Sequence, residues 1–316
     1  MGEMTGSGLA AMKRLHSGEQ GSNDGKSLMV PGLKYSQYRR GYRCPPGRFG
    51  AKCDLGIHTI FPAHNIYGDI PSIRQELGLN NQMSGWSPDK DFYAPLIKAL
   101  SPRLIVEIGV WKGLSAGHLA MAMKTYVRGG ALIAVDTWLG ALEFWTLSKS
   151  TKGKPDASRD LRLHHGYPHV YYEFLLNMID AGVQDYVIPF PSTSRMANTF
   201  LADAKVFPDL IHIDAAHEYV DAREDIELWW RLLRSGGMLL GDDFSPSWLG
   251  VVQAACEHAM HNGIPLYRTG KKWWVFKGPR VHHSRSNITA QAVFNTAELS
   301  RCIKSPVTVA PLRFQP

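Results

Sequence analysis

The stretch that decides the fold extends from DLIHID (residues 209–214) to GGMLLGDD (residues 236–243). Leu210–Ile213 and Met238–Leu240 are short apolar runs typical of buried strands, and each leads into acidic residues. Residues 217–233 between them are long enough for a crossover helix and carry apolar side chains at roughly helical spacing. The stretch therefore predicts a β-α-β unit with parallel strands.

The same alternation continues in both directions along the chain. Further strands are predicted over 104–108, 131–135, 187–190, 264–267 and 272–276. Further helices are predicted over 114–126, 195–204 and 249–261, one starts at 87–89 and reaches residue 100, and a helix-strand unit runs from about residue 169 through 186 to 188. A Thr269-Gly270 turn between the last two strands predicts a hairpin. The chain is thus expected to form a doubly wound α/β fold, with a mostly parallel seven-stranded sheet and a C-terminal antiparallel hairpin.

Charge divides the chain into three parts. The chain has 35 basic and 28 acidic residues. Residues 1–60 hold nine basic and four acidic residues, and residues 277–316 hold six basic residues and one acidic residue. The remainder holds 20 basic and 23 acidic residues, so the core is mildly acidic and nucleic acid is not expected as a partner. We predict a basic, disordered or extended arm over 1–60, a folded domain over 61–278 and a basic tail over 279–316.

Compartment is less clearly indicated. The sequence has no apolar stretch near the roughly 20 residues of a membrane span, and no apolar signal segment is visible, so the cytoplasm is the default expectation. Cys44 and Cys53 enclose a Pro/Gly-rich loop, and whether they pair is open. That loop and the glycosylation sequon at 287–289 leave the secretory pathway open. A homo-oligomer is also compatible with the sequence.

Three carboxylates follow the two deciding strands. Asp214 ends the first strand and Asp242 and Asp243 end the second, at the strand ends where open α/β sheets bind ligands. Oxygen donors with a single histidine nearby favour magnesium, manganese or calcium over zinc. The alternative for these acids is capping of the helices that follow them.

The turn after the first predicted strand, VEIGVWKGLSA (residues 106–116), has the features of a cofactor site. Its candidate cofactor residues are Glu107, Gly109, Gly113 and Ser115. Glycines there let the backbone approach a ligand closely, whereas Trp111 stands where a dinucleotide motif requires glycine, which disfavours a nicotinamide cofactor. Asp136, at the end of the second strand, is placed to accept hydrogen bonds from ribose hydroxyls.

The motifs EIGVWKG, AVDTW, PSTS, IDAAH and GDDF, in this order within residues 87–277, resemble class I S-adenosylmethionine-dependent methyltransferases. The resemblance is specifically to metal-dependent O-methyltransferases of the catechol and macrolide-sugar type. The separation of 28 residues between Asp214 and Asp242, and a basic residue three positions after Asp214, agree with that family. The resemblance implies S-adenosylmethionine as cofactor, magnesium as the metal, and Ser192 and Thr193 on the adenine side.

These features predict methyl transfer to the hydroxyl group of a small molecule, such as a sugar or natural product. His217 is the expected general base, because its ordinary pKa of about 6.5 suits proton transfer near neutral pH. Trp138, Phe144 and Trp145 are expected either as a lid over the acceptor or as core, and residues 148–159 as a mobile gating loop. The alternatives are a non-catalytic or nucleic-acid-directed protein on a methyltransferase fold, and a metal-dependent hydrolase.

Overall fold

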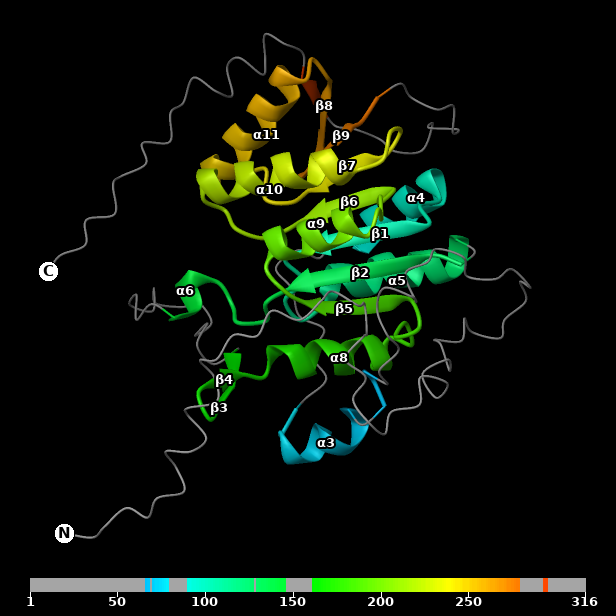
Figure 1. Ribbon diagram of the computed structural model, residues 1–316, viewed down its shortest axis with the longest axis vertical. Helices are drawn as coiled ribbons and strands as arrows, with labels where there is room; N and C mark the ends of the chain where they lie inside the picture. Colours follow the sequence, from blue (N-terminus) through cyan, green and yellow to red (C-terminus); the bar gives the residue numbers. More distant parts are fainter. Residues whose placement is uncertain are drawn as a thin grey trace, which may run out of the picture. The chain divides into compact units, whose positions relative to one another are not determined.

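The computed structural model describes residues 66–68, 70–79, 90–127, 129–145, 161–278 and 292–294. An eight-stranded sheet in the order β10-β8-β9-β7-β6-β1-β2-β5 forms its centre (Figure 1). Its strands are β1 (Leu104–Ile108), β2 (Ala131–Asp136), β5 (Val187–Pro191), β6 (Leu210–Ile213), β7 (Met238–Gly241), β8 (Leu266–Thr269), β9 (Lys272–Phe276) and β10 (Ala292–Phe294). The helices are α3 (Ile70–Glu76), α4 (Lys90–Leu100), α5 (Leu114–Tyr126), α6 (Leu142–Trp145), α8 (Val170–Asp180), α9 (Ser194–Asp203), α10 (Tyr219–Leu232) and α11 (Leu249–His261).

Helices cover both faces of the sheet. Apolar residues of α9, α10 and α11 form one core cluster with alternate residues of the central strands, and Trp229 and Trp273 are its largest fully buried members. Apolar residues of α3, α4, α5 and α8 form the other cluster, which includes Trp138 and Trp274. Neighbouring strand residues such as Ile105 and Val106 belong to opposite clusters, as the two-residue period of a strand requires. This three-layer arrangement confirms the doubly wound fold.

The order of the strands reverses beside β1. From β1 the chain builds outward through β2 to β5, and it then returns to place β6 on the other side of β1, followed by β7. All of these pairings are parallel, so the carboxyl ends of the five strands meet at one edge. In open α/β sheets the crevice at such a reversal is the usual place for a ligand.

An antiparallel section completes the sheet beyond β7. β9 pairs with β7 and β8, as expected from the hairpin, but β8 begins at Leu266, two residues later than predicted. β10 pairs with β8 and comes from the segment expected to be a tail. The sheet therefore has the seven predicted strands and one more. A separate small hairpin of β3 (Leu163–His164) and β4 (Tyr167–Pro168) was not predicted.

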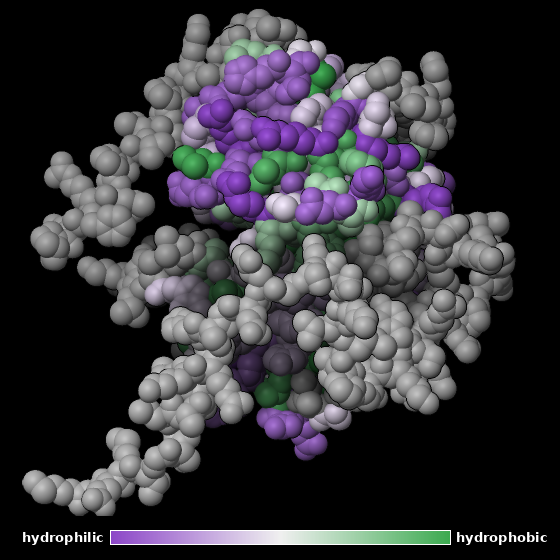
Figure 2. Space-filling model, in the orientation of Figure 1, coloured by the Kyte–Doolittle hydropathy of each residue, from purple (hydrophilic) through white to green (hydrophobic). Residues whose placement is uncertain are grey.

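The surface of the described part is mixed in character. Hydrophilic side chains predominate over α9, α10 and α11, with hydrophobic ones interspersed (Figure 2). None of the described helices is long and apolar enough to span a membrane. The basic arm, the Cys44–Cys53 loop, the gating loop at 148–159 and the sequon lie outside the described residues.

Candidate active site

Two turns close against each other at the point where the strand order reverses. Gly109 follows β1 with a φ of +78°, and its backbone N–H donates to Val135 O at 3.0 Å. A Cβ atom on Gly109 would lie 2.0 Å from the carbonyl oxygen of Asp214. Only glycine fits this contact, which brings the predicted cofactor turn next to the first predicted acid.

Asp136 holds the cofactor turn in place. Its Oδ2 accepts hydrogen bonds from the backbone N–H groups of Val110 and Trp111, both at 2.8 Å. Its Oδ1 accepts one from Trp138 N, also at 2.8 Å. A carboxylate that accepts three backbone amides fixes the shape of a turn. The role of Asp136 toward a ribose stays a prediction, and its role in shaping the turn was missed.

The same turn is tied to α8 by a buried ion pair. Lys112 Nζ lies 2.8 Å from Glu173 Oε2, and the two side chains are 1% and 2% exposed. Asn177 Nδ2 donates to Lys112 O at 2.7 Å. Gly113 caps α5 in the left-handed region, where a Cβ would come within 2.8 Å of the Phe174 ring. Gly113 thus allows α5 to pack closely on α8, and its role toward a cofactor stays a prediction.

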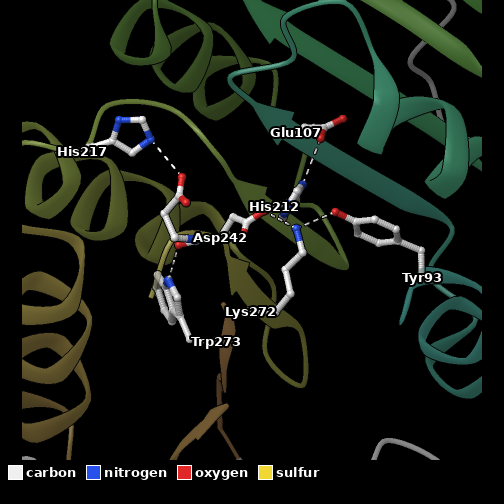
Figure 3. A network of polar contacts seen from close by, with 8 residues as sticks. Tyr93, Glu107, His212, His217, Asp242, Lys272 and Trp273 are labelled. Atoms are coloured by element: carbon white, nitrogen blue, oxygen red, sulfur yellow. Dashed lines mark hydrogen bonds and ion pairs between the residues drawn. The ribbon is translucent and has the colours of Figure 1, made fainter. Parts of the chain in front are cut away.

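Glu107 lies inside β1 rather than in the turn, and it is fully buried. Its Oε1 lies 2.9 Å from Nδ1 of His212 on the neighbouring strand β6 (Figure 3). Glu107 Oε2 and His212 Nε2 are buried without a hydrogen-bond partner among the described residues. Buried polar atoms of this kind call for a ligand or water. The cofactor role of Glu107 stays a prediction.

The remaining candidate cofactor residues differ in their surroundings. Ser192 is buried at the end of β5, and its Oγ has no hydrogen-bond partner within the described structure. Thr193 Oγ1 instead accepts from Met196 N at 3.3 Å and caps α9. Ser115 is half-buried in the first turn of α5. Of the two residues expected beside adenine, Ser192 has a buried hydroxyl without a partner in the described structure, whereas the hydroxyl of Thr193 caps α9. The cofactor role of both stays a prediction.

A buried lysine stands beside the second predicted acid. Lys272 Nζ, at the start of β9, donates to Asp242 Oδ2 and, at 2.8 Å, to the hydroxyl of Tyr93 from α4 (Figure 3). The side chains of Lys272 and Asp242 are 1% and 4% exposed. Burial, the largest single effect, would raise the pKa of Asp242, but the Lys272 ammonium, the backbone N–H of Asp243 and the nearby His212 together lower it. Asp242 is therefore an ionised carboxylate bound to an ammonium.

The third predicted acid binds the predicted base. His217 Nε2 lies 2.9 Å from Asp243 Oδ2, and the two side chains are 24% and 20% exposed. The indole of Trp248 stacks on the imidazole, with ring centroids 3.9 Å apart. Asp243 adopts a φ of +59°, and its N–H donates to Asp242 Oδ1 at 2.8 Å. These contacts fix the position and orientation of His217 at the carboxyl edge.

A divalent cation at Asp214, Asp242 and Asp243 does not fit this arrangement. Asp242 is bound to Lys272 and Asp243 to His217, and no three acidic, histidine or cysteine side chains of the described segments gather where one ion could reach them. Asp214 and Asp243 do not cap helices either, because the residues at the N-caps of α10 and α11 are Glu218 and Trp248. Burial, and then the charge of Asp242, raise the pKa of Asp214 to about 6.

The three aromatic residues after β2 do not act as one group. Trp138 is 1% exposed and packs on Tyr171 and Phe174, so it belongs to the core. Phe144 stacks on Trp111 of the cofactor turn, with ring centroids 4.7 Å apart. Trp145 is 46% exposed. Phe144 and Trp145 remain candidates for a contact with an acceptor, and Trp138 does not.

Three residues of this edge were not predicted from the sequence: Tyr93, His212 and Lys272. Lys271 and Lys272 follow a turn, and two adjacent lysines are normally expected in solvent. In the structure Lys271 is exposed and Lys272 is buried, and Trp273 lies opposite Gly241 of β7. A Cβ at Gly241 would lie 2.3 Å from the Trp273 ring, so the small residue in β7 admits the indole. The only sequence signal was the alternation of KWWVF, which puts Lys272 on the same face as Trp274.

Residues 106–244 match a family model described as a methyltransferase domain. An O-methyltransferase from Bacillus cereus in complex with SAH aligns at 16% identity and a TM-score of 0.43, covering 70% of this chain and 95% of its own. TomG from Streptomyces achromogenes, an O-methyltransferase involved in tomaymycin synthesis, aligns at 16% identity with a TM-score of 0.44, covering 68% of this chain and 91% of its own. The calicheamicin methyltransferase CalS11 aligns at 17% identity with a TM-score of 0.46, covering 74% of this chain and 100% of its own. No curated protein matches.

Proposed function

We propose that this chain, a class I S-adenosylmethionine-dependent methyltransferase, methylates a hydroxyl oxygen of a small molecule. Its methyltransferase domain lies in residues 106–244. The observation that carries the proposal is the position of His217. It is held by Asp243 and Trp248 at the edge where the cofactor turn and the acidic strand ends meet. The acceptor is a saccharide or a natural product.

The cofactor would lie across the carboxyl ends of β1, β2 and β5. The turn shaped by Asp136 borders this region, and Ser192 Oγ and Glu107 Oε2 are buried polar atoms without a partner in the described structure. A hydroxyl suits a hydrogen bond to adenine. Carboxylate oxygens suit the ammonium group of the methionine part, and Asp214, next to Gly109, offers a second carboxylate.

The reaction needs deprotonation and alignment more than covalent help. The hydroxyl oxygen of the acceptor attacks the methyl carbon, the carbon–sulfur bond breaks, and S-adenosylhomocysteine leaves while the hydroxyl proton passes to His217. Asp243 next to Nε2 would hold the imidazole in the tautomer whose Nδ1 is basic and would stabilise the imidazolium that forms. No step is assigned to a divalent cation.

Aromatic side chains support a small, partly apolar acceptor. Trp248 is 36% exposed and lies directly on His217, so one of its faces is available near the base. Small-molecule sites are mostly lined by apolar and aromatic side chains with a few polar groups that fix orientation. A sugar or a natural-product ring would stack its apolar face on Trp248 and point one hydroxyl at His217.

The compartment remains a separate proposal. The sequence alone favours the cytoplasm by default, but Cys256 in α11 is disulfide-bonded. Disulfides persist mainly in oxidising compartments. We therefore favour the secretory pathway over the cytoplasm. Mass spectrometry of the alkylated native protein tests this directly, because a reduced Cys256 would contradict it.

Calorimetric titration with S-adenosylmethionine and S-adenosylhomocysteine tests the cofactor. We expect both to bind in the micromolar range, with or without magnesium. Absence of binding in every condition would discard the methyltransferase proposal. Binding that is accompanied by salt-dependent association with RNA would instead favour a nucleic-acid acceptor.

The role of His217 is tested with His217→Ala. We expect turnover to fall by about 10²–10⁴-fold, with little change in the affinity for S-adenosylmethionine. His261→Ala is the matched control, since His261 is exposed at the end of α11 and should leave turnover unchanged. A wild-type pH–rate profile in the His217 variant would remove His217 as the base.

A further inference from the structure

We infer that the ammonium group of Lys272 takes the place of a divalent cation at this edge, so that the site works without a metal. The inference rests on the proposed function for its catalytic meaning, but not for its geometry. Lys272 Nζ is in direct contact with Asp242 Oδ2. One fixed positive charge thus lies against the buried carboxylate that follows β7.

The acidic side chains are already engaged. Asp242 Oδ2 accepts a hydrogen bond from Lys272 Nζ, and Asp242 Oδ1 accepts one from the backbone N–H of Asp243. Asp243 Oδ2 is hydrogen-bonded to His217 Nε2. A divalent ion needs several oxygens that face one point, and here those oxygens face an ammonium, an amide and an imidazole. A cation added beside Lys272 would also be repelled by it in a buried, poorly screened setting.

Lys272 is held firmly in this position. Its side chain is 1% exposed, and its Nζ lies 5.1 Å from the centre of the Tyr93 ring while it donates to the hydroxyl of Tyr93. Trp273 Nε1 donates to Asp242 O at 3.2 Å, which links the backbone of β7 to β9. Withdrawal of the lysine would leave a carboxylate buried without its charge partner, and such a state is strongly disfavoured.

The consequence for catalysis is a change in how the acceptor is activated. Without a Lewis acid to bind the acceptor oxygen, deprotonation falls to His217 and its partner Asp243. Lys272 is then a positioning residue: it keeps Asp242 ionised and the strand ends in place, and its positive charge contributes to the field at the edge.

Titration with Mn²⁺, followed by the loss of the free-ion signal in electron paramagnetic resonance, tests the inference. We expect the wild-type protein to show no site tighter than about 1 mM, which is the weak limit of the affinities of dedicated cation sites. Lys272→Met removes the charge but keeps an unbranched side chain, and it should create a Mn²⁺ site at least about tenfold tighter than any in the wild type. The double variant Lys272→Met/Asp242→Asn should lose that site again.

Lys272→Arg is the matched control, because it keeps the charge and should bind no Mn²⁺. Tight binding by the wild type that Asp242→Asn abolishes would overturn the inference. A folded Lys272→Met protein that binds no Mn²⁺ would overturn it as well. If Lys272→Met fails to fold, the wild type and Lys272→Arg still decide, since a tight site in either one contradicts a lysine in the place of the metal. Turnover of the chelator-treated wild type should be unchanged, and failure of the proposed function would appear separately, as absent binding of S-adenosylmethionine.

Discussion

Asp225 is a buried acid in α10, and its environment makes the stability of the fold depend on pH. It lies in α10, where it accepts a hydrogen bond from Ser194 Oγ, which in turn accepts one from Trp229 Nε1 at 2.8 Å. Burial raises the pKa of Asp225 to about 6, although the bond from Ser194 opposes this. When the pKa of an acid is higher in the folded than in the unfolded chain, the folded protein loses stability as the pH rises from the unfolded-state pKa to the folded-state pKa.

We predict that Asp225→Asn stabilises the protein at pH 7.5 by about 1–3 kcal/mol. The amide oxygen keeps an acceptor for Ser194 but cannot ionise. The gain should be complete above about pH 7, where the acid is ionised in both states, and vanish below about pH 3, where it is protonated in both states. Urea unfolding at pH 7.5 and at about pH 3 measures it. Asp221→Asn, at an exposed position in the same helix, should change little, and an equal gain at both pH values would contradict the assignment to ionisation.

At the scale of elements, long periodic segments could be predicted and short ones could not. The predicted bounds of Leu114–Tyr126, Leu210–Ile213, Leu249–His261 and Lys272–Phe276 agree with the structure. Each has a clear period, because one face or both faces are buried. The strands β3, β4 and β10 have two or three residues, too few for a period to be recognised.

The position of the candidate site could be predicted from the sequence, but the contacts between its side chains could not. The ends of β1, β2, β5, β6 and β7 meet because the strands are parallel, so the sequence could place the acids at one edge. Which atoms the side chains contact depends on neighbours far along the chain. Lys272 is 30 residues from Asp242 and 179 from Tyr93, and no local pattern reports such contacts. The cap by Thr193 was recognisable only after the start of α9 was known.

The turn between β1 and α5 gives a prediction about a single element junction. Gly109→Ala places a methyl group against the backbone of Asp214 and forces an L-residue into the left-handed region. We expect a loss of roughly 3 kcal/mol or more in the free energy of unfolding, together with weaker binding of S-adenosylmethionine. Gly263→Ala is the control, because Gly263 has a φ of +60° but no atom within 4 Å of an added Cβ.

Gly263→Ala should therefore show only the backbone cost, about 1–2 kcal/mol. Urea unfolding of the two variants separates the two contributions. If both variants lose the same amount, the close approach of the two turns does not constrain residue 109, and the contact between Gly109 and Asp214 would not explain why glycine stands there.

At the scale of the whole molecule, β10 shows that the sheet extends beyond the domain boundary expected at residue 278. β10 pairs antiparallel with β8, with Ala292 opposite Arg268 and Phe294 opposite Leu266. Without it, β8 would become the edge of the sheet. An uncovered edge strand presents unpaired backbone groups that favour association with other chains.

We predict that a chain ending after residue 278 is less stable and more prone to self-association than one ending after residue 296. Both lack the C-terminal residues 297–316, and only the longer one retains β10. The shorter chain loses the backbone pairing of β10 with β8, which should lower its melting temperature by several degrees, as about 1 kcal/mol does in a domain of this size. Calorimetry measures the stability and light scattering the association. Identical behaviour of the two chains would mean that the sheet is complete at β8, so that the boundary expected from the sequence holds and β10 adds nothing to the fold.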